Sequence, residues 1–414
     1  MKKSRYFIIR FLVILALLVS MNEIYVHTNW TNDVSKHADL LDSLARYQDS
    51  TEVLLLSSSS NYFYWGKDTS YKAISDYLQL YYPEIEVNAI NKGYLHAGMF
   101  RSIVQNIPPD APLQTLVLEV NLRSFGAFWL QSKVETSYAV QDLMMNPQYP
   151  KLLRRFLFAL SAYDKKSESE RKLLVDQIWR TSPFTIPYSF PFNTVHEWEQ
   201  EVVHRQFPTK SDGSKNWYLT DKCSGLIKAY AFDPYPQAKV RFEAFDDIVA
   251  IASSRGWNVV MVIMPANVDR IHDLLGPEIP RLLLAAQRQI KERYEQPNVR
   301  IIEALTAFPS DQFYEEYPTE HYLSSGKAWL AKQIATEISQ FDPIRFQPAT
   351  LDFPNPSPTF TEHEDGKLLK FKADSARQYE LSQFAGYHRI PYRYFLENEI
   401  ISLMRLEGNR IARD

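Results

Sequence analysis

Five short apolar runs along the chain have the pattern of buried parallel strands. Each is rich in Val, Ile and Leu and is bounded by polar or turn-forming residues. The runs are residues 52–56, 87–90, 116–120, 257–264 and 299–302. Apolar residues at helical spacing predict helices at about 70–81, 100–107, 237–254, 280–296 and 325–340. Strands that alternate with helices predict an α/β fold, with one mainly parallel sheet sandwiched between helices in three layers.

The alternation of strands and helices is interrupted in the middle of the chain. Residues 131–232 collect three tryptophans and a proline-rich stretch at 183–191. We interpret this segment as a mostly helical insertion that divides the α/β domain into two halves, 51–130 and 233–342. The C-terminal extension, 343–414, is proline-rich and then charged, and its pattern indicates no role.

The N-terminus is basic and then apolar. Four of the first ten residues are Lys or Arg, none is acidic, and the stretch from Tyr6 to Val26 is about long enough to cross a membrane. The positive flank predicts a signal anchor at 1–26 with the rest of the chain outside, followed by a polar stalk at 27–50. The alternatives are a cleaved signal peptide, although no clear small-x-small site follows the apolar run, and a buried helix of a soluble protein.

Composition narrows the classes of protein that fit. A net charge of −3, with 45% hydrophobic and 23% charged residues, is ordinary for a globular chain. A disordered chain or a basic nucleic-acid-binding surface is therefore a poor interpretation. Cys223 is the only cysteine, so we expect neither an intramolecular disulfide nor a multi-cysteine metal site.

Polar residues follow the predicted strands at the edge where open α/β sheets bind ligands. The run Ser57–Ser60 follows the first strand, Gly98 lies in the loop after the second, Asn121 follows the third, and His321 precedes the last helix. A serine hydroxyl becomes a nucleophile when an imidazole takes its proton. A glycine N–H and an asparagine amide can stabilise the oxyanion that forms. These residue types predict acyl transfer.

Each of these residues also has a structural interpretation. Serine runs often cap helices or line turns, and a histidine at a helix start often caps it. His96, in the loop before Gly98, is expected to be structural. Arg123 has two equal interpretations, a contact to an anionic substrate group or a structural ion pair. The tripeptide Thr-Glu-His at 319–321 recurs at 361–363 without a strand or an apolar helix beside it, so the tripeptide alone carries no meaning.

Taken in order, Ser59, Gly98, Asn121 and His321 resemble the four blocks of the SGNH (GDSL-like) hydrolase superfamily. The resemblance implies that Ser59 is the nucleophile and that His321 is the base. It also implies that Gly98 and Asn121 form the oxyanion hole, and that no metal or organic cofactor is needed.

The chain also departs from the family pattern. The match covers about 50–130 and 235–342. Ser57-Ser58 stands where the family often has Gly-Asp, so the position of the nucleophile within the serine run is open by one residue. The third block, Gly-x-Asn-Asp in the family, is Glu119-Val-Asn-Leu122 here.

The acid of the family's triad is the largest departure. Pro318 occupies the position three residues before the histidine where the family has its acid. Glu320 is our candidate to orient the imidazole, and Asp311, Glu315 and Glu316 upstream are the alternatives.

The anchor and the resemblance together predict a function. We expect a membrane-anchored, extracytoplasmic, SGNH-like serine esterase or O-acyltransferase that acts on acyl esters of envelope glycans or glycolipids. Similar anchored members of the superfamily handle acyl groups on envelope polymers. The alternative is a non-catalytic SGNH-like scaffold that binds a glycan or a membrane-bound acyltransferase. A flavodoxin-like nucleotide-binding domain fits an exported chain less well.

Overall fold

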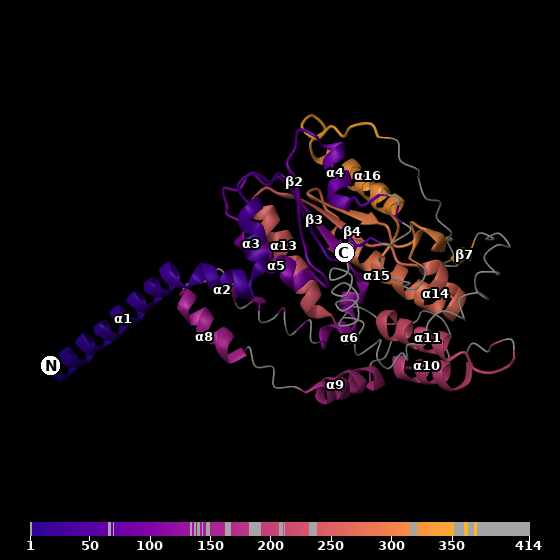
Figure 1. The fold of residues 1–414 in the computed structure, drawn as a ribbon, viewed down its shortest axis with the longest axis horizontal. Helices are drawn as coiled ribbons and strands as arrows, with labels where there is room; N and C mark the ends of the chain where they lie inside the picture. The colour runs from indigo at the N-terminus through magenta and orange to yellow at the C-terminus, as the bar shows by residue number, and fades with distance from the viewer. Residues whose placement is uncertain are drawn as a thin grey trace, which may run out of the picture.

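Five parallel strands form one sheet at the centre of the computed structural model, in the order β2-β1-β3-β4-β5 (Figure 1). The strands are β1 (Val53–Ser57), β2 (Val87–Asn91), β3 (Thr115–Val120), β4 (Asn258–Ile263) and β5 (Val299–Glu303). Every neighbouring pair in this sheet is parallel. The prediction of an α/β fold is confirmed, and each strand lies within one residue of its predicted bounds.

The structure describes residues 2–64, 68, 70–132, 135, 138, 141–142, 144–145, 150–161, 167–181, 192–206, 210, 212–231, 238–314, 321–351, 360–362 and 368–370.

Helices cover both faces of the sheet, because side chains alternate along each buried strand. Along β1, Leu54 and Leu56 join the core on one face, while Val53 and Leu55 join the core on the other. The first face is covered by α3 (Asp39–Tyr47), α5 (Ala97–Asn106), α13 (Lys239–Ser254) and α15 (Glu278–Tyr294). The second face is covered by α4 (Ile74–Tyr81) and α16 (Ser324–Phe341), which lie side by side (Figure 1).

Side-chain caps shift two helix starts from their predicted positions. Helix α4 begins at Ile74 rather than at about 70, and the Asp76 carboxylate accepts the N–H of Ala73 just before it. Helix α5 begins at Ala97 rather than at 100, because the His96 side chain caps it. The sequence did not predict α14 (Val268–Leu275), which Asn267 caps.

The N-terminal segment begins with one long apolar helix. Helix α1 (Lys2–Thr28) contains a stretch, Tyr6–Thr28, that is long and apolar enough to cross a membrane. Helices α2 (Trp30–His37) and α3 follow. Within the predicted stalk, 27–50, α3 packs onto the α/β body, because Leu40 and Leu44 are buried in its core.

The insertion between β3 and β4 contains only helical elements among its described residues. They are α8 (Lys151–Ser161), α9 (Glu168–Thr181), α10 (Val195–Glu201), the π-helical turn η2 (Val202–Gln206) and α11 (Trp217–Tyr230). Before them come a 3₁₀ turn, η1 (Leu122–Phe125), and the short helix α6 (Ala127–Leu130). Trp198 and Ile227 are buried in the same core as the first sheet face, so the insertion packs onto the α/β body.

Three short elements complete the described chain. The 3₁₀ turn η3 (Ser310–Gln312) precedes the segment of His321, and an antiparallel pair, β6 (Phe360–Glu362) and β7 (Leu368–Lys370), lies in the C-terminal extension. His363, in the repeated tripeptide, lies outside the described residues.

Gly326, in the first turn of α16, tests how tightly this helix packs. A Cβ at this position would lie 2.9 Å from ring carbons of both Phe308 and Tyr322. We expect Gly326→Ala to lower the free energy of unfolding by about 1–3 kcal/mol, because overpacking outweighs the gain in helix propensity. Urea denaturation of the full chain measures the change. Gly93→Ala is the control, since its nearest neighbour would be the Tyr62 hydroxyl at 3.8 Å; equal effects at the two positions would contradict the packing argument.

Candidate active site

Ser59 and His321 meet at the carboxyl end of β1. Ser59 Oγ lies 3.0 Å from His321 Nε2, although 262 positions separate the two residues. His321 is 7% exposed, and Ser59 is half-buried. The hydroxyls of Ser58 and Ser60 donate elsewhere, so Ser59 is the member of the serine run that faces the imidazole.

The imidazole is held by the residues around it. The His321 carbonyl accepts the N–H of Tyr314 at 3.3 Å. The ring of Phe63 stacks on the imidazole, with 4.5 Å between centroids and 23° between planes. The backbone N–H of Phe63 in turn donates to the Ser59 carbonyl at 2.8 Å. The turn that presents the hydroxyl therefore also supplies the ring that orients the base.

Glu119 is a buried carboxylate that holds the serine run. Its two oxygens accept three hydrogen bonds of 2.6 Å, from the N–H and the hydroxyl of Ser58 and from the hydroxyl of Ser60. The parallel pairing of Leu56 with Leu118 explains the contact, because it places Glu119 beside the serines that follow β1. Both neighbours of Ser59 are thereby fixed.

Gly98 differs from its predicted role. Its N–H donates to His96 Nδ1 at 3.2 Å and is therefore engaged within its own loop. The physical reason is that His96 caps α5, whose first N–H groups need an acceptor. His96 is 5% exposed and structural, as expected.

Asn121 stands at the carboxyl end of β3, as the oxyanion prediction requires. Its Oδ1 accepts the N–H of Arg123 at 3.0 Å and so caps η1. The N–H donors of the Asn121 side-chain amide are on its nitrogen, Nδ2, and not on the oxygen that caps η1. The guanidinium of Arg123 lies 5.6 Å from the centre of the Trp129 ring, a cation–π contact.

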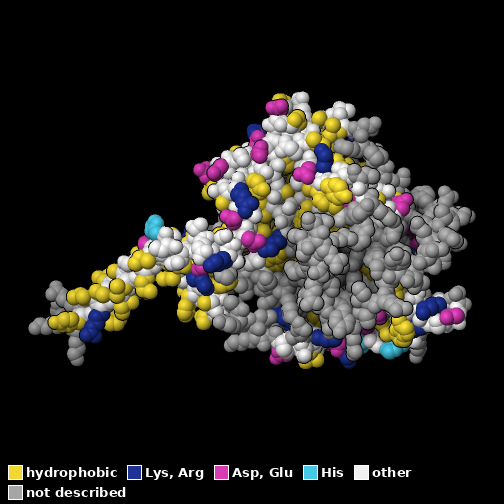
Figure 2. Space-filling view, viewed as in Figure 1, with side chains coloured by type: hydrophobic (Ala, Val, Ile, Leu, Met, Phe, Trp, Pro, Cys, Tyr) yellow, Lys and Arg dark blue, Asp and Glu magenta, His cyan; other side chains and the backbone are white. Residues whose placement is uncertain are grey.

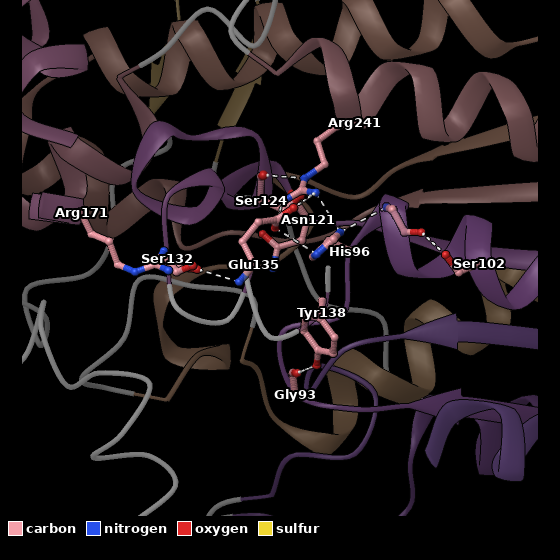
Figure 3. Close-up of polar contacts among 11 residues, drawn as sticks. Gly93, His96, Ser102, Asn121, Ser124, Ser132, Glu135, Tyr138, Arg171 and Arg241 are labelled. Carbon is pink, nitrogen blue, oxygen red and sulfur yellow. Dashed lines mark hydrogen bonds and ion pairs between the residues drawn. The ribbon is translucent and has the colours of Figure 1, made fainter. Parts of the chain in front are cut away.

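A buried charge network joins Arg241 to His96, Ser124 and Glu135, as Figure 3 shows. Arg241, 1% exposed, donates to His96 Nδ1 at 2.8 Å, to the Ser124 carbonyl at 2.9 Å, and to both oxygens of Glu135 at 3.1 and 2.6 Å. His96 Nε2 lies 3.0 Å from Glu135. Arg241 thus joins the loop after β2, the loop after β3 and the insertion.

Burial and charge set the protonation of this network. Burial and the Arg241 guanidinium lower the pKa of His96, against the opposing effect of Glu135. Burial would raise the pKa of Glu135, but the hydrogen bonds from His96 and Arg241 lower it to about 2. With Nδ1 accepting two N–H groups, the neutral imidazole of His96 carries its proton on Nε2, beside the ionised Glu135.

Two hydrogen bonds tie the loop after the serine run to α16. The Lys327 ammonium donates to the Phe63 carbonyl and lies 4.0 Å from the centre of the Tyr64 ring. Asp68 accepts the N–H of Ser324 at 2.6 Å and the hydroxyl of Tyr314. The half-buried side chains of Tyr62, Phe63 and Tyr64 belong to this loop and follow the nucleophile directly.

Of the four predicted acids, one lies among the described residues. Glu320, Glu315 and Glu316 lie outside the described residues, as does Pro318. Asp311 is exposed on η3. Among the described residues, no group of three or more His, Cys, Asp or Glu side chains is placed to hold a metal ion.

No protein-family model matches the chain, and no curated protein is significantly similar to it. Chemically, the arrangement provides a serine hydroxyl within hydrogen-bond reach of a base and an asparagine amide at the adjacent strand end.

Glu119 and Arg241 are the contributors that the sequence analysis missed. One signal for Glu119 was present, because a carboxylate inside an apolar strand needs hydrogen-bond donors. No feature of the sequence pointed to Arg241, since a charged residue on a helix is most often exposed.

Replacing Glu119 tests whether it holds the serine run. Glu119→Ala leaves an N–H and two hydroxyls without their acceptor, so we expect the free energy of unfolding to fall by about 3 kcal/mol. Glu119→Gln, which keeps one acceptor oxygen, should cost less. Thermal and urea denaturation measure both. Glu303→Ala, which removes an exposed carboxylate at the end of β5, should cost at most about 1 kcal/mol; a Glu119→Ala cost no larger than that would overturn the assignment.

Burial of Lys327 predicts a pH dependence of stability. Burial lowers the pKa of this amine from 10.5 to about 8, against the opposing charge of Asp68. Between these values the unfolded chain binds more protons than the folded one, so stability should rise as pH rises. We expect the melting temperature of the wild type, relative to Lys327→Met, to increase from about pH 7.5 to about pH 9.5. If the melting temperatures of the two proteins change with pH in the same way across this window, the lowered pKa of Lys327 is ruled out. Tyrosine ionisation does not disturb the comparison, because it affects both proteins alike.

Proposed function

We propose that the chain is a membrane-anchored SGNH-like serine esterase or O-acyltransferase that acts on acyl esters of envelope glycans or glycolipids. The observation that carries the proposal is the 3.0 Å contact between Ser59 Oγ and His321 Nε2 at the carboxyl ends of a parallel sheet. Ligands of open α/β sheets bind at this edge.

The proposed reaction has two halves. His321 Nε2 takes the proton of Ser59 as Oγ attacks the ester carbonyl, and the tetrahedral intermediate collapses to an acyl-serine while His321 protonates the departing alcohol. In the second half, His321 deprotonates water or a sugar hydroxyl, which attacks the acyl group, and the proton returns to Ser59. Water gives hydrolysis, and a sugar hydroxyl gives transfer.

The oxyanion is stabilised at the strand ends in this proposal. Asn121 Nδ2 is the proposed donor. The N–H of Gly98 is not assigned this role, because it donates to His96 Nδ1. Glu320 is the proposed carboxylate that orients the imidazole of His321.

The location and substrate class rest on two features. Helix α1, whose first nine residues include four cations, would anchor the chain with the domain outside the cytoplasm. The half-buried aromatic side chains of Tyr62, Phe63 and Tyr64 beside the nucleophile suit stacking against a sugar or an acyl chain.

One observation favours a second candidate function, a non-catalytic scaffold. The N–H of Gly98 is engaged by His96, and Pro318 replaces the acid of the family pattern. Such a scaffold would bind a glycan or a membrane-bound acyltransferase with the same surface.

A fluorophosphonate probe on the purified full-length protein separates the two functions. We expect covalent labelling that Ser59→Ala abolishes and that His321→Asn slows by about 100-fold or more, because the base no longer takes the proton. Ser57→Ala is the matched control within the serine run, since its buried hydroxyl has no hydrogen-bond partner among the described residues; it should label normally. A folded wild type that does not label, or labelling that survives in Ser59→Ala, would contradict the serine mechanism.

A further inference from the structure

We propose that α8 is an interfacial helix that lies in the outer boundary of the lipid bilayer and seats the domain against the membrane. The inference rests on the anchoring role of α1 in the proposed function, but not on the chemistry at Ser59.

An exposed apolar stripe runs along α8. Leu153, Phe156 and Leu160 are 49%, 59% and 60% exposed, and their spacing of three and four residues places them on one face of the helix. The helix has three cationic residues and no acid. Its remaining apolar side chains include Phe158, which is buried. An apolar stripe with cationic neighbours is typical of helices that lie in a membrane interface.

Helix α8 starts against the outer part of α1. The side chain of Asn22, 2% exposed and next after the apolar run of α1, accepts the N–H of Leu152 at 3.0 Å. In Figure 1, α8 leaves α1 near this point and runs across its axis rather than along it. Figure 2 shows apolar side chains along α1 and again on α8, below the junction. The two helices therefore expose apolar side chains on either side of the junction.

The residues around the junction are those of a lipid headgroup region. Tyr25 and Trp30 make an edge-to-face contact with centroids 6.2 Å apart, and Lys151 lies 4.6 Å from the centre of the Trp30 ring. Arg155 pairs with Asp33 at 2.7 Å. Aromatic and cationic side chains of this kind gather at membrane–water interfaces.

The length of α1 places this junction at the membrane boundary. A helix crosses the hydrocarbon core with about 20 residues, which takes the span from Tyr6 to about Tyr25. Asn22, which accepts a hydrogen bond from the first turn of α8, is therefore level with the outer boundary of the bilayer. Lipid is the occupant that this geometry brings to the stripe.

Site-directed spin labelling of the full chain in lipid nanodiscs tests the proposal. Single cysteines replace Leu153, Phe156 and Leu160 one at a time. The native Cys223 stays unlabelled, because it is buried and burial raises the pKa of its thiol to about 12. Leu173→Cys on α9 is the matched control, since Leu173 is 57% exposed and also lies on a helix of the insertion. Val13→Cys in α1 reports the bilayer itself.

Collision rates with oxygen, which concentrates in lipid, and with a nickel chelate, which stays in water, give the readout. We expect the oxygen-to-nickel ratio at the three α8 positions to be several-fold above that at Leu173→Cys and below that at Val13→Cys. Ratios equal to the Leu173 control, with Val13→Cys in lipid, would overturn the α8 proposal and leave the anchor intact. A water-exposed Val13→Cys would overturn both. Stripe labels that face water in lipid discs and become shielded only when membrane proteins are added would also overturn it, in favour of a protein-docking face.

Discussion

The buried carboxylate of Glu119 is the interaction on which the site depends. A carboxylate inside a parallel sheet is tolerated only when donors surround it, and here the serine run supplies three. Glu119 and the serine run therefore complement each other, because the carboxylate needs donors and Ser58 and Ser60 supply them. The same contact leaves the hydroxyl of Ser59, between them, to face His321.

Charged groups around the site serve mainly to fix loops at the carboxyl edge of the sheet. Lys327 holds the loop after the serine run from the α16 side, and Asp68 of that loop accepts the N–H of Ser324 in α16. Arg241 and Glu135 hold the loops after β2 and β3 from the α13 side and from the insertion. Loop backbone at a sheet edge has few apolar contacts, so hydrogen bonds to buried charges provide the rigidity that a preorganised site needs.

The sheet was predictable from the sequence because each strand is a short apolar run with little competing pattern. The starts of α4 and α5 were harder to predict, because they depend on caps by Asp76 and His96 and not on the periodicity of apolar residues. The polar composition of 27–50 concealed Leu40 and Leu44, two side chains that are enough to pack α3 onto the core. The meeting of Ser59 with His321 follows from strand order. The engagement of Gly98 by His96 depends on a single side-chain orientation, which no sequence pattern specifies.

The place of the insertion has a consequence for how the chain is made. Strands β3 and β4 are neighbours in the sheet, yet residues 121–257 lie between them. At ribosomal rates of about 5–20 residues per second, the apolar edge of β3 waits on the order of ten seconds for its partner. During that interval β1, β2 and β3 present an open strand edge, which is the surface that associates most readily with other chains. Biogenesis of this protein thus places its greatest demand on chaperones midway through synthesis, when the insertion emerges, rather than at the end.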